Sequence, residues 1–215
     1  MTGTGEMAEA LEAGALGLLP TDTVYGLVCL ASNRNAALDL YRLKGRDGIQ
    51  PTAVIAADTD VLLESFPGID GNVAAGVRAL LPGPFTLVVP NPGRRFSWLS
   101  AARPDTIGVR VPALEGAAAE IVRHVGMIVA TSANLPGGAD PRRLDDVPAK
   151  IRAAVAFAVD GGELPGVPST VIDLTGEAPV VLRVGAGDLD EALARLAGVL
   201  TQSLPQHDVT FTPEE

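Results

Sequence analysis

The segment of residues 16–46 most constrains the fold, because it joins an apolar run, a polar cluster and a helical stretch. The run at 16–19 predicts a buried strand, which Pro20 ends. Three small polar side chains follow at Thr21–Thr23, and a helix is expected at about 35–43. Since open α/β sheets bind ligands at the carboxyl ends of their strands, the polar cluster is a candidate ligand contact.

Two cations lie where that helix ends. Lys44 and Arg46 stand on either side of Gly45, which breaks the helical pattern. Two cations this close in a loop suit a phosphate or a carboxylate. The alternative is a solvated helix end without a ligand, and this segment alone does not choose between the two.

The rest of the chain alternates short apolar runs with helical patterns. Further strands are expected at 52–57, 85–89, 107–111, 127–130, 156–159, 169–174 and 179–184, and further helices at 59–66, 72–81, 114–125, 143–154 and from Asp188 to about 200. Some strands adjoin through short turns, which favours a mixed sheet covered by helices. We therefore expect one α/β domain over 1–200 and a disordered polar tail at 201–215.

Composition narrows the class of protein. Hydrophobic residues make up 47% of the 215 residues and aromatic residues 4%, which predicts a globular chain with an aliphatic core. The net charge of −10 argues against a general nucleic-acid coat or an anionic membrane surface. No apolar run approaches the length of a membrane span. The one cysteine, Cys29, lies in an apolar run and is interpreted as a core thiol of a cytoplasmic protein.

Common catalytic and metal motifs are missing from the sequence. It contains no GxxxxGK[ST] phosphate loop, and Gly185-Ala186-Gly187 lacks the third glycine of a dinucleotide fingerprint. The two histidines, His124 and His207, and the single cysteine match no familiar zinc spacing, so no metal site made of protein ligands is expected. His124 lies in a helical pattern without a nearby acidic motif, which disfavours a Ser-His-Asp triad.

What remains is a set of short polar clusters beside the ends of expected strands and helices. They are Thr21–Thr23, Lys44–Arg46, Thr106–Arg110, Thr131–Asn134, Ser169–Thr170 and Arg183. Taken singly, each has a structural explanation, such as a capped turn or a strand residue that faces solvent. Together they combine basic side chains with small hydroxyl and amide groups, a mixture that binds a polyphosphate and a small polar acid.

Six motifs in these regions resemble the YrdC family, the L-threonylcarbamoyladenylate synthases and their YciO-like relatives. The motifs are PTDTVYGL, KGR, PGPFTLVV, IGVRVP, TSAN and STVIDLTGEAPVVLR, in the family's order and spacing between about 16 and 183. The paired KxR and SxN signature of the family is represented by Lys44, Arg46, Ser132 and Asn134. The resemblance implies a twisted mixed α/β sheet with packed helices and a concave, basic pocket.

The resemblance also implies an activity. Such enzymes make threonylcarbamoyl-AMP from L-threonine, bicarbonate and ATP, and they release pyrophosphate. The product supplies the threonylcarbamoyl group of a modified adenosine in tRNAs (t6A) through separate transfer proteins. Mg²⁺ would travel with ATP. Some members bind double-stranded RNA, a partner that the negative net charge does not favour here.

The resemblance assigns roles residue by residue. The residues assigned to threonine are Thr23, Arg110, Ser132 and Ser169, with Arg110 taking the carboxylate. Those assigned to ATP are Lys44, Arg46, Gln50, Thr106, Asn134, Arg142 and Arg183, of which Lys44 and Arg46 are also the expected catalytic pair. Since threonine and bicarbonate give a carbamate, which is already an anionic nucleophile, such a site needs cations more than acid–base residues.

The sequence departs from the family pattern at Asp47, Gln50 and Ile55, and after TSAN at Pro136-Gly137 and Arg142. Ile55 stands where a histidine near threonine occurs in family members, so we expect a weaker threonine site. Two alternatives stay open. One is a YciO-like paralogue that binds nucleotide or double-stranded RNA without synthase activity, and the other is an unrelated hydrolase-like or structural α/β domain.

Overall fold

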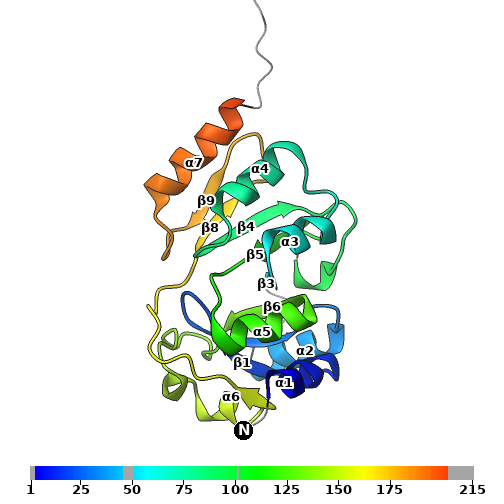
Figure 1. Cartoon of the computed structure of the whole chain (residues 1–215), viewed down its shortest axis with the longest axis vertical. Coiled ribbons are helices and arrows are strands. Elements are labelled where there is room, and N and C mark those ends of the chain that lie inside the picture. Colours follow the sequence, from blue (N-terminus) through cyan, green and yellow to red (C-terminus); the bar gives the residue numbers. More distant parts are fainter. Residues whose placement is uncertain (1–2, 46–50, 101, 203–215) are drawn as a thin grey trace, which may run out of the picture.

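The computed structural model describes residues 3–45, 51–100 and 102–202, which form one mixed sheet with helices on both faces (Figure 1). The nine strands of this described part lie in the order β7-β1-β2-β6-β3-β5-β4-β8-β9. Their bounds are β1 Gly17–Pro20, β2 Tyr25–Leu30, β3 Ala53–Ala56, β4 Phe85–Pro90, β5 Thr106–Arg110, β6 Met127–Ser132, β7 Phe157–Ala158, β8 Thr170–Asp173 and β9 Val180–Arg183.

The pairing of these strands confirms the mixed sheet. The pairs β1–β7, β3–β5 and β4–β8 are parallel, and the other neighbouring pairs of described strands are antiparallel. Antiparallel neighbours can be joined by tight turns, whereas parallel neighbours need a crossover. This is why β1 runs into β2 after a few residues, while a helix separates others, such as β2 from β3.

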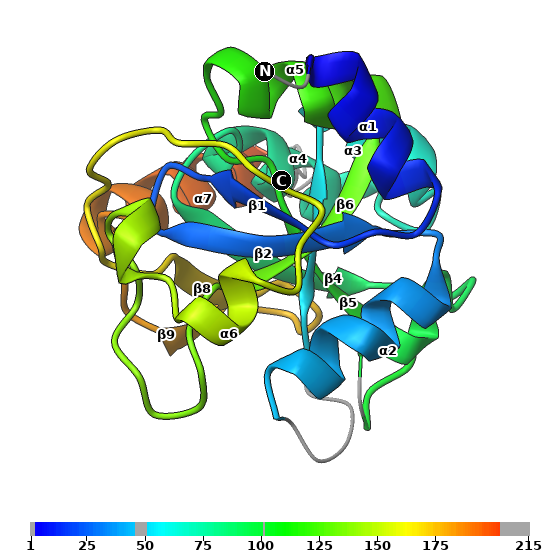
Figure 2. The same cartoon turned by 90° about the horizontal axis from the view of Figure 1, so that it is seen from below.

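The helices pack in two groups, one on each face of the sheet. Their bounds are α1 Thr4–Glu12, α2 Arg34–Leu43, α3 Thr59–Ser65, α4 Gly71–Leu80, α5 Gly116–Val125, α6 Ala149–Arg152 and α7 Leu189–Gln202, with 3₁₀ turns at Ser97–Leu99 and Leu144–Asp146. Residues of α2, α3, α4 and α7 belong to the larger apolar cluster, and residues of α1 and α5 to a smaller one. Figure 2 shows α1 and α5 on one side of β1 and β2, with α2 on the other.

The last helix begins at the cap that the sequence predicts. The carboxylate of Asp188 accepts a hydrogen bond from the backbone N–H of Glu191, at 2.9 Å, as an N-cap does. The helix continues to Gln202, slightly beyond the expected end near 200. Thr201 and Gln202, the first two residues of the tail predicted to be disordered at 201–215, are therefore helical, and the rest of that tail lies outside the described residues.

Two segments differ from the sequence prediction. Strand β2 is not predicted; its residues up to Cys29 are all buried, and periodicity alone does not distinguish such a short apolar run from a buried helix segment. The helix expected at 143–154 is instead a 3₁₀ turn followed by the short α6. Pro148 separates them, since proline lacks a backbone N–H and disfavours a helical residue before it.

Two further predictions concern the interior and the membrane. Cys29 is fully buried, and burial raises the pKa of its thiol to about 12, so the interpretation as a core thiol is confirmed. Within the described residues, we find no helix with the length and apolar character needed to span a bilayer.

Candidate functional site

A cavity of about 640 Å³ opens on the same face of the sheet as α5. Its floor lies where four adjacent strands carry very small residues, namely Gly26 of β2, Ala130 of β6, Ala53 of β3 and Gly108 of β5. Ala53 and Ala130 are register partners, and a Cβ atom added to Gly108 would lie 3.6 Å from the Cβ of Ala53. The cavity therefore exists because these strands omit side chains there.

In three of these strands, β2, β3 and β6, larger residues occupy the same face two positions away. Val28, Ile55 and Ile128 are buried in the cluster that α1 and α5 cover. One face of the sheet is thus closed core at one end and open cavity at the other, according to side-chain size. Since side chains alternate between faces along a strand, this division follows directly from the sequence once the register is known.

The position of Ile55 contradicts the expectation that it borders threonine. Its side chain is fully buried among residues of α1, α5 and the neighbouring strands, and it does not line the cavity. It is the small residue two positions earlier, Ala53, that faces the cavity. The structure therefore removes the reason for expecting a weaker threonine site at Ile55, because this side chain is buried in the cluster that α1 and α5 cover.

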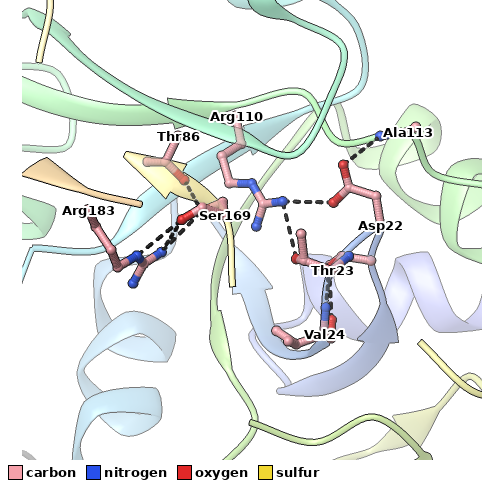
Figure 3. Close-up of polar contacts among 9 residues, drawn as sticks. Asp22, Thr23, Val24, Thr86, Arg110, Ala113, Ser169 and Arg183 are labelled. Carbon is pink, nitrogen blue, oxygen red and sulfur yellow. Dashed lines mark hydrogen bonds and ion pairs between the residues drawn. The ribbon is translucent and has the colours of Figure 1, made fainter. Parts of the chain in front are cut away.

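Arg110 lies at the carboxyl end of β5 and lines the cavity. Its Nη2 is 2.7 Å from Oδ1 of Asp22 and 3.4 Å from Oγ1 of Thr23 (Figure 3). The side chains of Arg110 and Asp22 are each only 11% exposed. Burial lowers the pKa of Arg110, Asp22 raises it, and the nearby cation of Arg183 lowers it further.

The turn between β1 and β2 holds Thr23 in place. Oγ1 of Thr21 accepts hydrogen bonds from the backbone N–H groups of Thr23 and Val24, each at 3.2 Å, and donates to the carbonyl of Val24 at 2.8 Å. The two threonine hydroxyls are 3.0 Å apart. A hydroxyl that caps its own turn in this way fixes the backbone locally, so Thr23 faces the cavity on a rigid turn.

Ser169 and Arg183 form the opposite part of the lining. Nε and Nη2 of Arg183 donate to the carbonyl of Ser169, at 3.1 and 2.9 Å, and Nη2 is also 3.2 Å from its Oγ. Thr86 of β4 lies beside them, with its hydroxyl 2.7 Å from that of Ser169. Figure 3 shows these three side chains next to Arg110.

Lys44, Ser132 and Asn134 meet as the paired signature predicts. Nζ of Lys44 donates to the carbonyl of Ser132 and, at 2.9 Å, to Oδ1 of Asn134, which also accepts from Oγ of Ser132 at 2.8 Å. Lys44 is only 1% exposed. The alternative of a solvated helix end is therefore wrong for Lys44.

The other residues assigned to ATP differ in their placement. Thr106 lines the cavity, and its hydroxyl donates to the carbonyl of Arg103, another lining residue. Arg142 does not line the cavity; its Nη2 is 2.7 Å from Oε1 of Glu163, and its side chain is half exposed. Arg46 and Gln50 lie outside the described residues, so their assignments stay predictions.

Three residues of this region have no individual role in the sequence prediction. Asp22 lies inside a recognised cluster but has no role assigned by the resemblance, and Thr86 lies in an apolar run. Arg103 lies in a segment read as loop, and its Nη1 is 3.0 Å from Oδ2 of Asp173. Only the fold brings Thr86 and Arg103 to the cavity, because their sequence neighbours carry no polar pattern.

The charged groups that the structure describes around the cavity show no arrangement typical of a bound metal. Three arginines and one aspartate, Asp140, are the charged residues among its described lining. In the part of the chain that the structure describes, no three His, Cys, Asp or Glu side chains gather where a metal ion could bind.

A glycine behind Ser169 offers a test of how tightly this lining is held. A Cβ atom on Gly185 would lie 2.1 Å from the carbonyl oxygen of Pro168 and 2.5 Å from that of Ser169. We expect Gly185→Ala to displace Ser169, to destabilise the fold by about 1–3 kcal/mol as overpacking does, and to weaken binding at the cavity. Thermal unfolding and ligand titration measure the two effects.

The matched control for this change is Gly198→Ala. Gly198 lies in α7, and an added Cβ would meet nothing within 4 Å. This variant should gain stability from the higher helix propensity of alanine and leave binding unchanged. Equal melting temperatures and equal ligand affinities of the two variants would show that the backbone at Ser169 is free to adjust.

The chain matches a known protein family along most of its length. The family model described as telomere recombination, which covers Sua5, YciO and YrdC proteins, matches residues 9–185. The threonylcarbamoyl-AMP synthase of Pyrococcus abyssi is 35% identical over 182 residues, which are 84% of this chain and 53% of that protein. The chain thus spans about half the length of this relative.

Two solved structures share the fold. P. abyssi Sua5 complexed with L-threonine superposes with a TM-score of 0.74 at 30% identity, covering 91% of this chain and 58% of that one. Escherichia coli YciO superposes with a TM-score of 0.77 at 25% identity, covering 88% of this chain and 92% of that one. Each similarity therefore covers most of this chain.

Proposed function

Because the chain belongs to the Sua5/YciO/YrdC family, we propose that it is an L-threonylcarbamoyladenylate synthase. It would make threonylcarbamoyl-AMP from L-threonine, bicarbonate and ATP in the cytoplasm and release pyrophosphate. This would make it a nucleotidyltransferase. The product would pass to transfer proteins that modify tRNA.

The observation that carries this proposal is the lining of the cavity. Arg110, Thr23 and Ser169 gather at one cavity of about 640 Å³, near the cluster of Lys44, Ser132 and Asn134. Guanidinium and hydroxyl groups suit an amino acid carboxylate, and a buried ammonium suits phosphate. A volume of this size lies in the range of pockets that bind small molecules.

The proposed reaction has two steps. The amine of threonine and bicarbonate give a carbamate and water, and a carbamate oxygen then attacks the α-phosphorus of ATP, so that pyrophosphate leaves. Arg110 would hold the threonine carboxylate, and Lys44 would stabilise the charge near the phosphates. Mg²⁺ would arrive with ATP as part of that substrate. Little acid–base chemistry is needed, because catalysis here rests on positioning and electrostatic stabilisation.

The test is pyrophosphate release from MgATP by the purified protein. We expect release to need both threonine and bicarbonate, because the carbamate is the nucleophile, and the product mass to match threonylcarbamoyl-AMP. Threonine-independent release would instead show simple ATP hydrolysis. The matched comparison uses L-serine in place of L-threonine, which tests the methyl contact with the cavity.

A second candidate is supported by the structural match to YciO, which covers most of both chains. In this case the cavity would bind nucleotide or double-stranded RNA without synthase activity. Nucleotide binding without any threonine-dependent pyrophosphate release would favour it over the synthase.

A further inference from the structure

The carboxylate of Asp22 faces Arg110 rather than the cavity. Its Oδ1 accepts from Nη2 of Arg110 at 2.7 Å, and its Oδ2 accepts from the backbone N–H of Ala113 at 3.3 Å. Arg110 and Thr23 line the cavity, whereas Asp22 is not among its lining residues. Both carboxylate oxygens are thus engaged by the protein, as Figure 3 shows.

Arg110 needs such a partner because of where it lies. Its side chain is nearly buried, and the cation of Arg183 is close enough to lower its pKa. A buried guanidinium beside a like charge is costly unless an anion compensates it. The carboxylate of Asp22 supplies that charge, and its influence on the pKa of Arg110 opposes those of burial and Arg183.

Asp22 also fixes the direction of the guanidinium. Within the described part of the chain, the hydrogen bonds of Arg110 leave from Nη2, toward Asp22 and Thr23. Nε of Arg110 is buried and has no hydrogen-bond partner among the described residues. Since an arginine recognises a carboxylate through a planar fork of donors, holding one corner of the fork sets the direction of the rest.

The contact joins two distant parts of the sheet. Asp22 lies in the turn that follows β1, and Arg110 ends β5. In the strand order, β2, β6 and β3 lie between β1 and β5. The ion pair therefore ties the turn that carries Thr23 to the end of β5, so that Thr23 and Arg110 stay side by side at the cavity.

We propose that Asp22 is a positioning residue, which orients and neutralises Arg110 so that the guanidinium can receive the carboxylate of the amino acid substrate. This inference rests on the proposed synthase function and deepens it. Asp22 acts through Arg110 and touches no substrate. Loss of Asp22 is therefore expected to weaken the binding of threonine and to leave the binding of ATP unchanged.

The experiment measures steady-state pyrophosphate release with Asp22→Asn, which keeps the shape and an acceptor oxygen but removes the charge. We expect the KM for threonine to rise about tenfold to a hundredfold, the size of a lost charge-assisted hydrogen bond. The KM for ATP should stay within about twofold. Asp22→Glu, which restores the carboxylate, should recover part of the threonine affinity.

Two controls separate positioning from other roles. Asp60→Asn removes a carboxylate from an exposed ion pair with Arg78 and should leave both KM values unchanged. Inhibition by 3-hydroxybutyrate, a carboxylate without the amine, should weaken in Asp22→Asn by a factor similar to the change in threonine KM. Inhibition that stays as in the wild type would place Asp22 at the ammonium group and overturn the proposal.

Other outcomes of these measurements would overturn the role of Asp22 or the proposed function. An unchanged threonine KM in Asp22→Asn would overturn the proposal. Equal rises in the KM values for threonine and ATP, together with a lower melting temperature, would also overturn it, because they indicate a purely structural role. A wild-type protein without threonine-dependent pyrophosphate release would refute the proposed function instead. The wild-type measurement therefore distinguishes failure of the function from failure of the inference.

Discussion

Arg110→Met should lower kcat/KM for threonine by about a hundredfold or more. The side chain is nearly buried at the cavity, and its guanidinium is the cation proposed to bind the substrate carboxylate. Hydrogen bonds to charged groups contribute about 1.5–3 kcal/mol each, and a bidentate contact loses two of them. Pyrophosphate release at varied threonine concentration measures the loss.

The variant also leaves the carboxylate of Asp22 without its cation. Removing one partner of a buried ion pair costs about 3–5 kcal/mol, so a loss of folded protein could mimic a loss of binding. The double variant Arg110→Met with Asp22→Asn removes both charges and should regain melting temperature without regaining activity. Recovery of threonine turnover in the double variant would show that Arg110 does not bind the substrate.

Lys44→Met is expected to lower kcat/KM for ATP by about tenfold to a thousandfold. The ammonium is almost fully buried and donates to Asn134 and to Ser132, of which Ser132 lines the cavity, so its positive charge lies behind the lining at this point. Methionine keeps most of the apolar stem. The expected change is therefore electrostatic, and the KM for threonine should change much less.

The chain provides a matched control for this variant, because its sequence contains one other lysine, Lys150. Lys150 lies exposed on α6, so Lys150→Met should leave both kinetics and stability unchanged. Loss of the ammonium of Lys44 also removes a donor from Ser132 and Asn134, a cost of about 1–3 kcal/mol. Melting temperatures of both variants show this cost. Wild-type kinetics in Lys44→Met would remove Lys44 from the catalytic assignment.

Much of the fold could be predicted from local patterns. The strands at 85–89 and 107–111 and the helices at 59–66 and 72–81 agree with the structure to within a residue or two. These segments have clear boundaries, because proline, glycine or capping residues stand at their ends. Strand β2 was not predicted, because a short run that is buried throughout fits a buried helix segment as well as a strand when periodicity is the only signal.

The site was predictable only in part, because some of its contacts depend on packing between elements distant in the sequence. The pairing of Lys44 with Ser132 and Asn134 follows from a motif, since all three residues lie in recognised signatures. The placement of Ile55 depends on which helix covers which end of β3, and nothing within the strand encodes that. The role of Asp22 could not be predicted either, because it depends on a partner 88 residues away in the sequence.

The floor of small residues has a consequence for how this protein can change. At Gly26, Ala53, Gly108 and Ala130 the chain forgoes apolar burial that would be worth about 1.5–3 kcal/mol for each large aliphatic side chain. Stability and substrate volume are thus in direct competition at these four positions. A laboratory selection for heat resistance alone would enrich bulkier residues there. The resulting variants would be more stable, and their filled cavity could no longer hold a substrate.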